Sequence, residues 1–204
     1  ARWISGRISL LEKSLWYGLH DALPNTTTLI AERGGALVAA LTLVFDSPMK
    51  LPADAVFPEE LDSLRRQGRR VCEIVSLVHT EKKASACIQM VQHLFKLAYI
   101  AAYHLESCTD FIITVNPHHA GYYEKRLLFT RHSAEKTYGK VSGAPALLLG
   151  LDLVAAQQTY RERFDHLSEA SNFYRFFKHK VEELAGWLAG QRQPLDLESL
   201  RRYF

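Results

Sequence analysis

The chain contains, at its centre, the run Val71-Cys72-Glu73-Ile74-Val75-Ser76-Leu77-Val78, and later the run Phe111-Ile112-Ile113-Thr114-Val115. Both runs are apolar and rich in β-branched residues, which is typical of strands covered on both faces. Between them, residues 84–105 repeat apolar side chains at helical spacing. A strand, a long helix and a second strand predict a crossover unit with the two strands parallel. We therefore expect an α/β fold in which Glu73 is largely buried.

Outward from this unit, the pattern predicts a hairpin and several helices. Two β-prone runs, 28–32 and 37–45, flank Gly34-Gly35, a dipeptide that allows positive φ in a tight turn. The proline-rich residues 46–57 predict a loop. The other expected elements are a helix over 10–19, a helix from Pro58 to Gly68, a helix opened by Pro117, a strand over 145–153, helical pattern over 154–191 with a break near Ser168, and a short helix over 196–203.

Composition sets broad limits on function. The chain has 204 residues, 48% hydrophobic and 23% charged, which is enough for one sizeable core. It shows neither a long apolar run nor a signal-peptide pattern, so we expect a cytoplasmic protein without a transmembrane segment. Its three cysteines lack metal-ligand spacing, and we expect free thiols and no metal. Because the chain opens with Ala1 rather than methionine, we expect a trimmed segment.

Further runs carry a resemblance to a known family. They are Asp46-Ser47-Pro48 with Leu51-Pro52, Asn116-Pro117-His118-His119-Ala120-Gly121-Tyr122-Tyr123, and Gly143-Ala144-Pro145-Ala146-Leu147-Leu148. In this order, together with 71–78, they resemble the N-acyl amino acid synthases, relatives of the acyl-homoserine-lactone autoinducer synthases. The resemblance implies a GNAT-like mixed, mostly antiparallel sheet flanked by helices. It also implies transfer of a long-chain acyl group from acyl carrier protein to an amine or amino acid.

Two parts of the chain are expected on this basis. Residues 1–153 would form the GNAT-like acyltransferase domain, and residues 154–204 a helical C-terminal extension packed on it. Aromatic residues of the extension, Phe173, Phe176, Phe177 and Trp187, are either core or the lining of an acyl tunnel.

The chemistry of thioester aminolysis suggests roles for three residues. The reaction needs a base for the amine, donors for the carbonyl oxyanion, and an acid for the departing thiolate. Glu73 is the candidate base, since burial would raise its pKa toward the working range; its alternative role is an ion pair. Tyr123 is the candidate acid or a core tyrosine, and His119 either orients substrate or caps its helix. By resemblance, the backbone N–H groups of Ser76, Leu77 and Val78 would bind the thioester oxygen.

Two departures from the family concern the acceptor. Where the family usually has glycine, threonine and an arginine along its third strand, this chain has Ala39-Ala40-Leu41-Thr42, and where an arginine usually follows the glutamate by three positions, it has Ser76. Such arginines could hold an acceptor carboxylate by bidentate pairing, which serine and threonine cannot replace. We therefore expect free amino acids to be poor acceptors.

The composition of the segment before the long helix indicates which acyl donor the protein uses. Coenzyme A is bound through its pyrophosphate by glycine-rich loops, and Thr80-Glu81-Lys82-Lys83-Ala84-Ser85 contains no glycine. We therefore expect no tightly bound cofactor and an acyl-phosphopantetheine donor on acyl carrier protein. Basic residues predicted to dock the acidic carrier are Arg65, Arg66, Arg69, Arg70, Lys82 and Lys83. The alternative for the arginines is a solvated helix end.

Two functional hypotheses follow. The first is an N-acyltransferase that uses acyl carrier protein. The second is a catalytically weakened relative that binds acyl chains or carrier protein, as the missing arginines would allow. Nucleic-acid binding is disfavoured, because the arginine cluster lacks interleaved aromatic residues.

Overall fold

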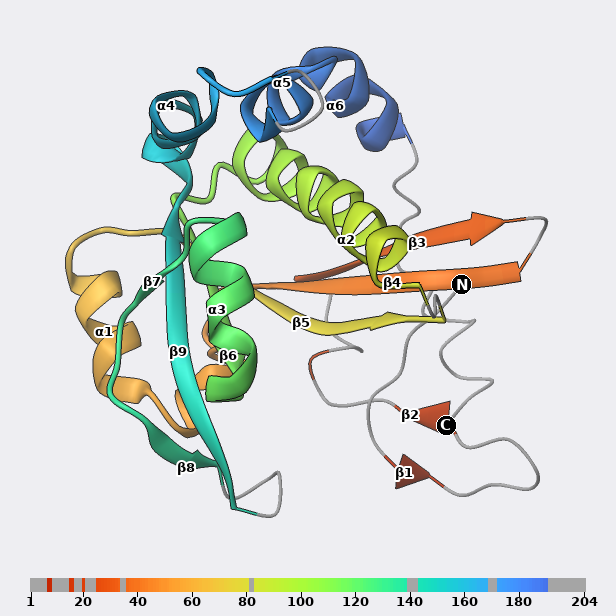
Figure 1. The fold of residues 1–204 in the computed structure, drawn as a ribbon. Coiled ribbons are helices and arrows are strands. Elements are labelled where there is room, and N and C mark those ends of the chain that lie inside the picture. Colours follow the sequence, from red (N-terminus) through yellow and green to blue (C-terminus); the bar gives the residue numbers. More distant parts are fainter. Residues whose placement is uncertain are drawn as a thin grey trace.

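A computed structural model describes residues 7–8, 15–16, 20, 25–33, 36–80, 83–138, 143–168 and 172–190. Its main feature is a sheet of seven strands (Figure 1). Five of them follow one another across the sheet: β3 (Thr26–Arg33), β4 (Ala36–Phe45), β5 (Val71–His79), β6 (Asp110–Val115) and β9 (Ala144–Asp152). The short strands β7 (Thr130–Arg131) and β8 (Lys136–Tyr138) both pair with β9.

Strand directions confirm the predicted mixed sheet. Each pairing within it is antiparallel except that of β5 with β6, which is parallel. The expected hairpin is formed by β3 and β4, and the long helix between the parallel strands is α2 (Ala84–Tyr99), which continues into the π-helical turn η3 (Ile100–Leu105). The fold is therefore GNAT-like, with the predicted parallel pair at its centre.

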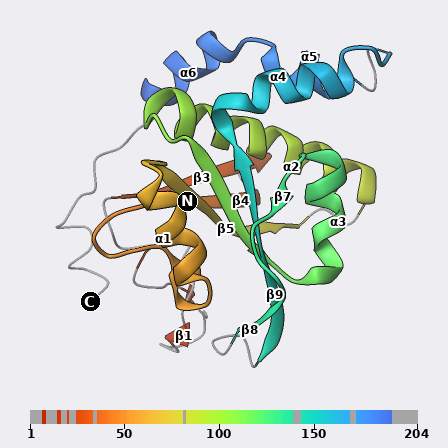
Figure 2. The ribbon, with the colours of Figure 1, turned by 90° about the vertical axis from the view of Figure 1, so that its left-hand side faces the viewer.

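Side chains from the two faces of the sheet form two separate cores. On one face, alternate residues such as Cys72, Phe111 and Leu149 pack with α2 and α3 (Pro117–Arg126). On the other, Val71, Ile112 and Leu148 pack beneath α1 (Pro58–Arg66) and the 3-10 turn η2 (Pro52–Ala55). Figure 2 shows α1 and α3 on opposite sides of β9. Strand alternation thus decides which helices each side chain meets.

Three C-terminal helices lie against α2 and η3: α4 (Leu153–Phe164), α5 (Phe173–Lys178) and α6 (Val181–Gly190). Their aromatic rings join the first core, with Phe177 4.5 Å from Tyr99 and 4.7 Å from Tyr160 between ring centroids. Phe173 and Phe177 are buried, whereas Trp187 is exposed. These phenylalanines are therefore core residues. The division of the chain at 153/154 stays a prediction.

Some expected elements differ from the observed ones. Of the helix expected over 10–19, the structure describes only β2 (Leu15–Trp16), which pairs as a strand with β1 (Arg7–Ile8), so the helix prediction is wrong there. The rest of that segment and the helix expected over 196–203 lie outside the described residues. The elements η2, β7 and β8 were not predicted from the sequence. Within the described part, no helix is long and apolar enough to cross a membrane.

Candidate functional site

Glu73 lies on the face of β5 that is covered by η2 and α1. Its side chain shares this face with Val71, and only 2% of the residue is exposed. The carboxylate Oε2 accepts a hydrogen bond of 2.8 Å from the backbone N–H of Ala53, at the start of η2. The predicted burial of Glu73 is therefore confirmed, and its partner is a backbone amide rather than the arginine or lysine of the alternative role.

Burial raises the pKa of Glu73 to about 8, and the negative charge of Asp54 adds to the rise. The Ala53 N–H and the nearby Thr114 hydroxyl act in the opposite direction. The Thr114 hydroxyl does not reach hydrogen-bond geometry, and among the described residues it has no partner. At neutral pH the carboxyl is therefore mostly protonated, yet close to the pH at which it can accept a proton.

Tyr138 interacts electrostatically with the same carboxyl from the side of the sheet where β8 pairs with β9. It lies on β8 and packs against the core beneath α1. Its pKa is raised by burial and, to a lesser extent, by the charge of Glu73. The side chains of Glu73, Thr114 and Tyr138 are thus a small polar cluster within an otherwise apolar core. Tyr138 and Thr114 were not predicted from the sequence, although Thr114 is a hydroxyl residue within an apolar run.

β5 separates from β6 just after Glu73. The parallel pairing joins Val71–Glu73 to Asp110–Ile112, but β5 continues to His79. Further along β5, Ser76 and Leu77 lie opposite the single residue Leu41 of β4, which is a β-bulge. Ser76 has φ 53°, in the left-handed region. The backbone groups of Ser76, Leu77 and Val78 therefore lie at an irregular point of the separated strand, and their role toward a thioester oxygen stays a prediction.

Tyr123 lies on α3, on the opposite face of the sheet from Glu73. Its ring packs edge-on against Tyr122 and Phe129, 5.5 and 5.9 Å away between centroids, in the core that contains Phe111. Burial raises its pKa. The structure therefore does not bring Tyr123 and Glu73 together on one face, and the acid role of Tyr123 stays a prediction.

His119 is exposed in the first turn of α3. The helix is capped by Asn116, whose side-chain oxygen accepts a 3.0 Å hydrogen bond from the backbone N–H of His118. The imidazole of His119 is thus not the cap that its alternative role required.

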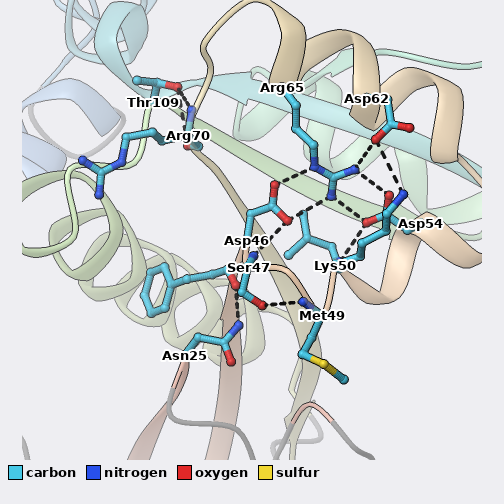
Figure 3. Close-up of polar contacts among 12 residues, drawn as sticks. Asn25, Asp46, Ser47, Met49, Lys50, Asp54, Asp62, Arg65, Arg70 and Thr109 are labelled. Carbon is cyan, nitrogen blue, oxygen red and sulfur yellow. Dashed lines mark hydrogen bonds and ion pairs between the residues drawn. The ribbon is translucent and has the colours of Figure 1, made fainter.

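Two of the arginines predicted to dock a carrier are held in internal ion pairs. Arg65 contacts Asp46, Asp54 and Asp62, each at 2.7 Å (Figure 3), and these carboxylates raise its pKa. Arg69 pairs with Asp110 and with Asp152, the latter at 2.8 Å.

The other predicted docking residues differ in their surroundings. Arg66 is exposed, and Arg70 is exposed while donating a 2.7 Å hydrogen bond to the carbonyl of Glu106. Lys83 is exposed just before α2, and Lys82 lies outside the described residues. Carrier docking therefore remains a prediction that concerns mainly Arg66 and Arg70.

The positions of the missing family arginines are uncharged. Thr42 is fully buried, and its hydroxyl lies 3.0 Å from that of Thr28 on the neighbouring strand. Arg131 lies on β7, shortly after α3, and forms a 2.6 Å ion pair with Glu124 at the surface. Neither observation supplies a cation for an acceptor carboxylate. Within the described residues, no group of three or more His, Cys, Asp or Glu side chains could hold a metal.

A hollow between η3, α4, α5 and α6 is lined by Tyr99, His104, Gln157, Phe177, Lys178, Lys180, Val181, Glu182 and Glu183. Because several of these side chains are charged, the hollow does not have the apolar lining expected of an acyl tunnel.

Comparisons with known proteins agree with this fold. The chain is similar to the solved structure of FeeM, an N-acyl amino acid synthase from uncultured soil microbes, with 28% identity, coverage of 66% of this chain and 76% of that chain, and a TM-score of 0.60. It is also similar in fold to BjaI, a CoA-dependent acyl-homoserine lactone synthase, solved with MTA, with 12% identity, coverage of 73% and 68%, and a TM-score of 0.52. No curated protein sequence matches the chain.

The family model described as N-acyl amino acid synthase FeeM matches residues 5–152, which is most of the chain. The family and the acyltransferase fold together support N-acyltransferase activity. By this match the chain belongs to the FeeM family of N-acyl amino acid synthases.

Proposed function

We propose that this protein transfers a long-chain acyl group from an acyl carrier protein to an amine, with Glu73 as the base. The observation that carries the proposal is the buried carboxyl of Glu73, whose pKa of about 8 suits it to accept a proton from an attacking amine. Its position beside the point where β5 leaves β6 supports a role close to the thioester.

In the proposed reaction the amine nitrogen attacks the thioester carbonyl carbon, and Glu73 accepts the amine proton directly or through one water. Backbone N–H groups at the Ser76 bulge would stabilise the oxyanion. As the carbon–sulfur bond breaks, Tyr123 would give a proton to the departing thiolate, and His119 would orient the substrate. Glu73 and Tyr123 would act from the two faces of the sheet, on either side of the separated strands.

The donor is proposed to be a carrier-protein thioester rather than a coenzyme A thioester. The segment before α2 has no glycine to let backbone amides approach a pyrophosphate, whereas a carrier arm ends in one phosphodiester and brings an acidic surface. Exposed Arg66 and Arg70 offer positive charge to such a surface. We expect Arg66→Glu with Arg70→Glu to weaken carrier binding, and the weakening to shrink as salt rises.

The acceptor is proposed to be an amine without a carboxylate. Thr42 and Ser76 cannot pair with a carboxylate as arginine does, and the loss of such a contact costs about 1.5–3 kcal/mol, or one to two decades in affinity. Common amino acids such as tyrosine should therefore react slowly.

A second candidate is a binding module for acyl chains or carrier protein. It is favoured by the 2% exposure of Glu73, which leaves the carboxyl covered by η2.

The test is an acylation assay with acyl carrier protein and coenzyme A as alternative donors, against amino acids and simple amines, for the native chain and Ser76→Arg. We expect amide formation with simple amines and the carrier donor, and a gain toward amino acids in Ser76→Arg. Faster reaction with coenzyme A thioesters would contradict the donor assignment, and fast reaction of a free amino acid with the native chain would contradict the acceptor assignment. Tight carrier binding with no amide from any amine would favour the second candidate.

A further inference from the structure

Cys87 and His79 form a thiol–imidazole pair outside the group around Glu73. The Cys87 Sγ lies 3.1 Å from Nε2 of His79, the last residue of β5. Cys87 is in the first turn of the 16-residue helix α2, where helix N–H groups favour a negative charge. A cysteine whose thiol contacts a histidine that can take its proton has the arrangement of a nucleophile with an adjacent base.

Tyr122 of α3 is a third polar side chain that interacts electrostatically with Cys87. The phenol oxygen of Tyr122 is buried although the residue is partly exposed, and among the described residues this oxygen has no hydrogen-bond partner. Its pKa is raised to about 12, first by burial and then by the negative charges of Tyr123 and Cys87. β5 and α2 therefore supply the thiol–imidazole pair, and α3 carries a phenol oxygen whose hydrogen-bonding capacity is unused among the described residues.

The pair also lies where the proposed donor would enter. β5 is no longer paired with β6 beyond Glu73, and His79 follows the bulge residues Ser76 and Leu77 by two positions. Cys87 is partly exposed, whereas Cys72 and Cys108 are buried. A thioester whose carbonyl lies at the bulge would be near the His79 imidazole and hence near the Cys87 thiol.

We propose that Cys87 is a nucleophilic site that accepts an acyl group from a thioester, with His79 as its base and Tyr122 as a donor to the carbonyl oxygen. This inference rests on the proposed function only for the class of donor. His79 takes the Cys87 thiol proton, and the thiolate sulfur attacks the carbonyl carbon. The bond from that carbon to the donor sulfur then breaks, and the donor thiolate takes the proton from the His79 imidazolium. The products are S-acyl-Cys87 and a free donor thiol.

The experiment uses a small probe, octanoyl-N-acetylcysteamine, so that neither carrier nor coenzyme A binding is required. Intact-protein mass spectrometry of the full chain should show one octanoyl group that hydroxylamine removes. Cys87→Ser should show no such group. His79→Asn should acylate at least tenfold more slowly at pH 7, and its difference from the native chain should narrow at higher pH as hydroxide replaces the missing base.

The matched control is His93→Asn. His93 is also an exposed histidine, and it lies on α2, the helix that contains Cys87, with its Nδ1 2.8 Å from the carbonyl oxygen of Gln89. It should acylate at the native rate. Equal acylation in Cys87→Ser would overturn the proposal, as would an equal slowing in His93→Asn and His79→Asn. A native chain that iodoacetamide alkylates at Cys87, but the thioester does not acylate, would also overturn it.

A parallel assay of amide formation separates this inference from the proposed function. Amide formation without any Cys87 adduct would overturn the inference alone. A Cys87 adduct without amide formation would support the inference and count against the transfer to amines.

Discussion

At Glu73, opposing influences act on a single carboxyl. Burial and the charge of Asp54 raise its pKa, whereas the Ala53 N–H and the Thr114 hydroxyl lower it, and the outcome is a pKa of about 8. The folded state therefore binds more protons than the unfolded state between the ordinary pKa of 4.5 and about 8. Glu73 consequently makes the protein less stable as pH rises through this range, and its effect is level above it.

Because ionisation of Glu73 destabilises the folded state, the variant Glu73→Gln should lose this pH dependence. It keeps an oxygen acceptor for the Ala53 N–H but cannot ionise. Between pH 5.5 and pH 8.5, the free energy of unfolding of the variant should gain roughly 2–4 kcal/mol relative to the native chain. Urea unfolding at both pH values measures this. The exposed Glu135→Gln is the control and should follow the native chain; a constant difference between Glu73→Gln and native at both pH values would argue against the raised pKa.

At the same scale, sequence pattern predicted the burial of Glu73 but not its neighbours. An apolar run on both sides of a carboxylate is a local signal. The approach of Tyr138 depends on β8, a strand of three residues whose pairing with β9 is not encoded in local periodicity. The opposite faces of Glu73 and Tyr123 could not be predicted either, because the side on which α3 packs is a tertiary property.

Among the elements, α1 is joined to η2 and the end of β4 by one guanidinium group. Arg65 of α1 contacts Asp54 of η2 and Asp46 just after β4, and the Asp54 side chain also accepts a 2.7 Å hydrogen bond from the N–H of Leu51 (Figure 3). The helix that covers Glu73 is thus fixed by the same Asp54 whose charge raises the Glu73 pKa.

We expect Arg65→Met to destabilise the fold by about 2–4 kcal/mol, because it leaves the poorly exposed Asp54 and Asp46 without their cation. Arg66→Met, one position along the same helix and exposed, should change stability by no more than about 0.5 kcal/mol. Urea unfolding of both variants provides the measurement. Equal stability of the two would mean that the ion pairs of Arg65 contribute little.

α5 is held to α2 in a different way. The buried Lys96 of α2 donates to the carbonyls of Phe176, at 2.8 Å, and His179, at the C-terminal end of α5, and it lies 5.1 Å from the Phe176 ring centroid. Carbonyls at a helix C-terminus have no partner within the helix. A lysine therefore takes the place of a C-terminal cap.

Lys96→Met should lower the free energy of unfolding by about 1–3 kcal/mol, because the two carbonyls lose their hydrogen-bond donor. Part of this loss is offset, because a charged amine is no longer buried. Hydrogen exchange of α5 should accelerate more than that of α4. The exposed Lys178→Met, on α5 itself, serves as control and should leave exchange unchanged. Uniform acceleration across the whole chain, rather than at α5, would show that Lys96 does not act locally.

Over the whole molecule, long elements were predictable and short ones were not. The strands and helices around the parallel pair have continuous apolar patterns, and they lie where the sequence indicated. β7 and β8 have exposed or half-exposed residues and exist through their pairing with β9. The two cores that separate Glu73 from Tyr123 lie on the two faces of the sheet, so that the proposed reaction would use both faces at the point where β5 leaves β6.

The rate of amide formation as a function of pH tests this account, with acyl carrier protein as donor and a weakly basic amine that stays neutral. For the native chain, kcat/KM should rise up to tenfold per pH unit and level off near pH 8, where Glu73 loses its proton. Glu73→Gln should be slower by about 10²–10⁴-fold and lose this rise. An unchanged rate and an unchanged pH profile in Glu73→Gln would contradict the assignment of Glu73 as the base.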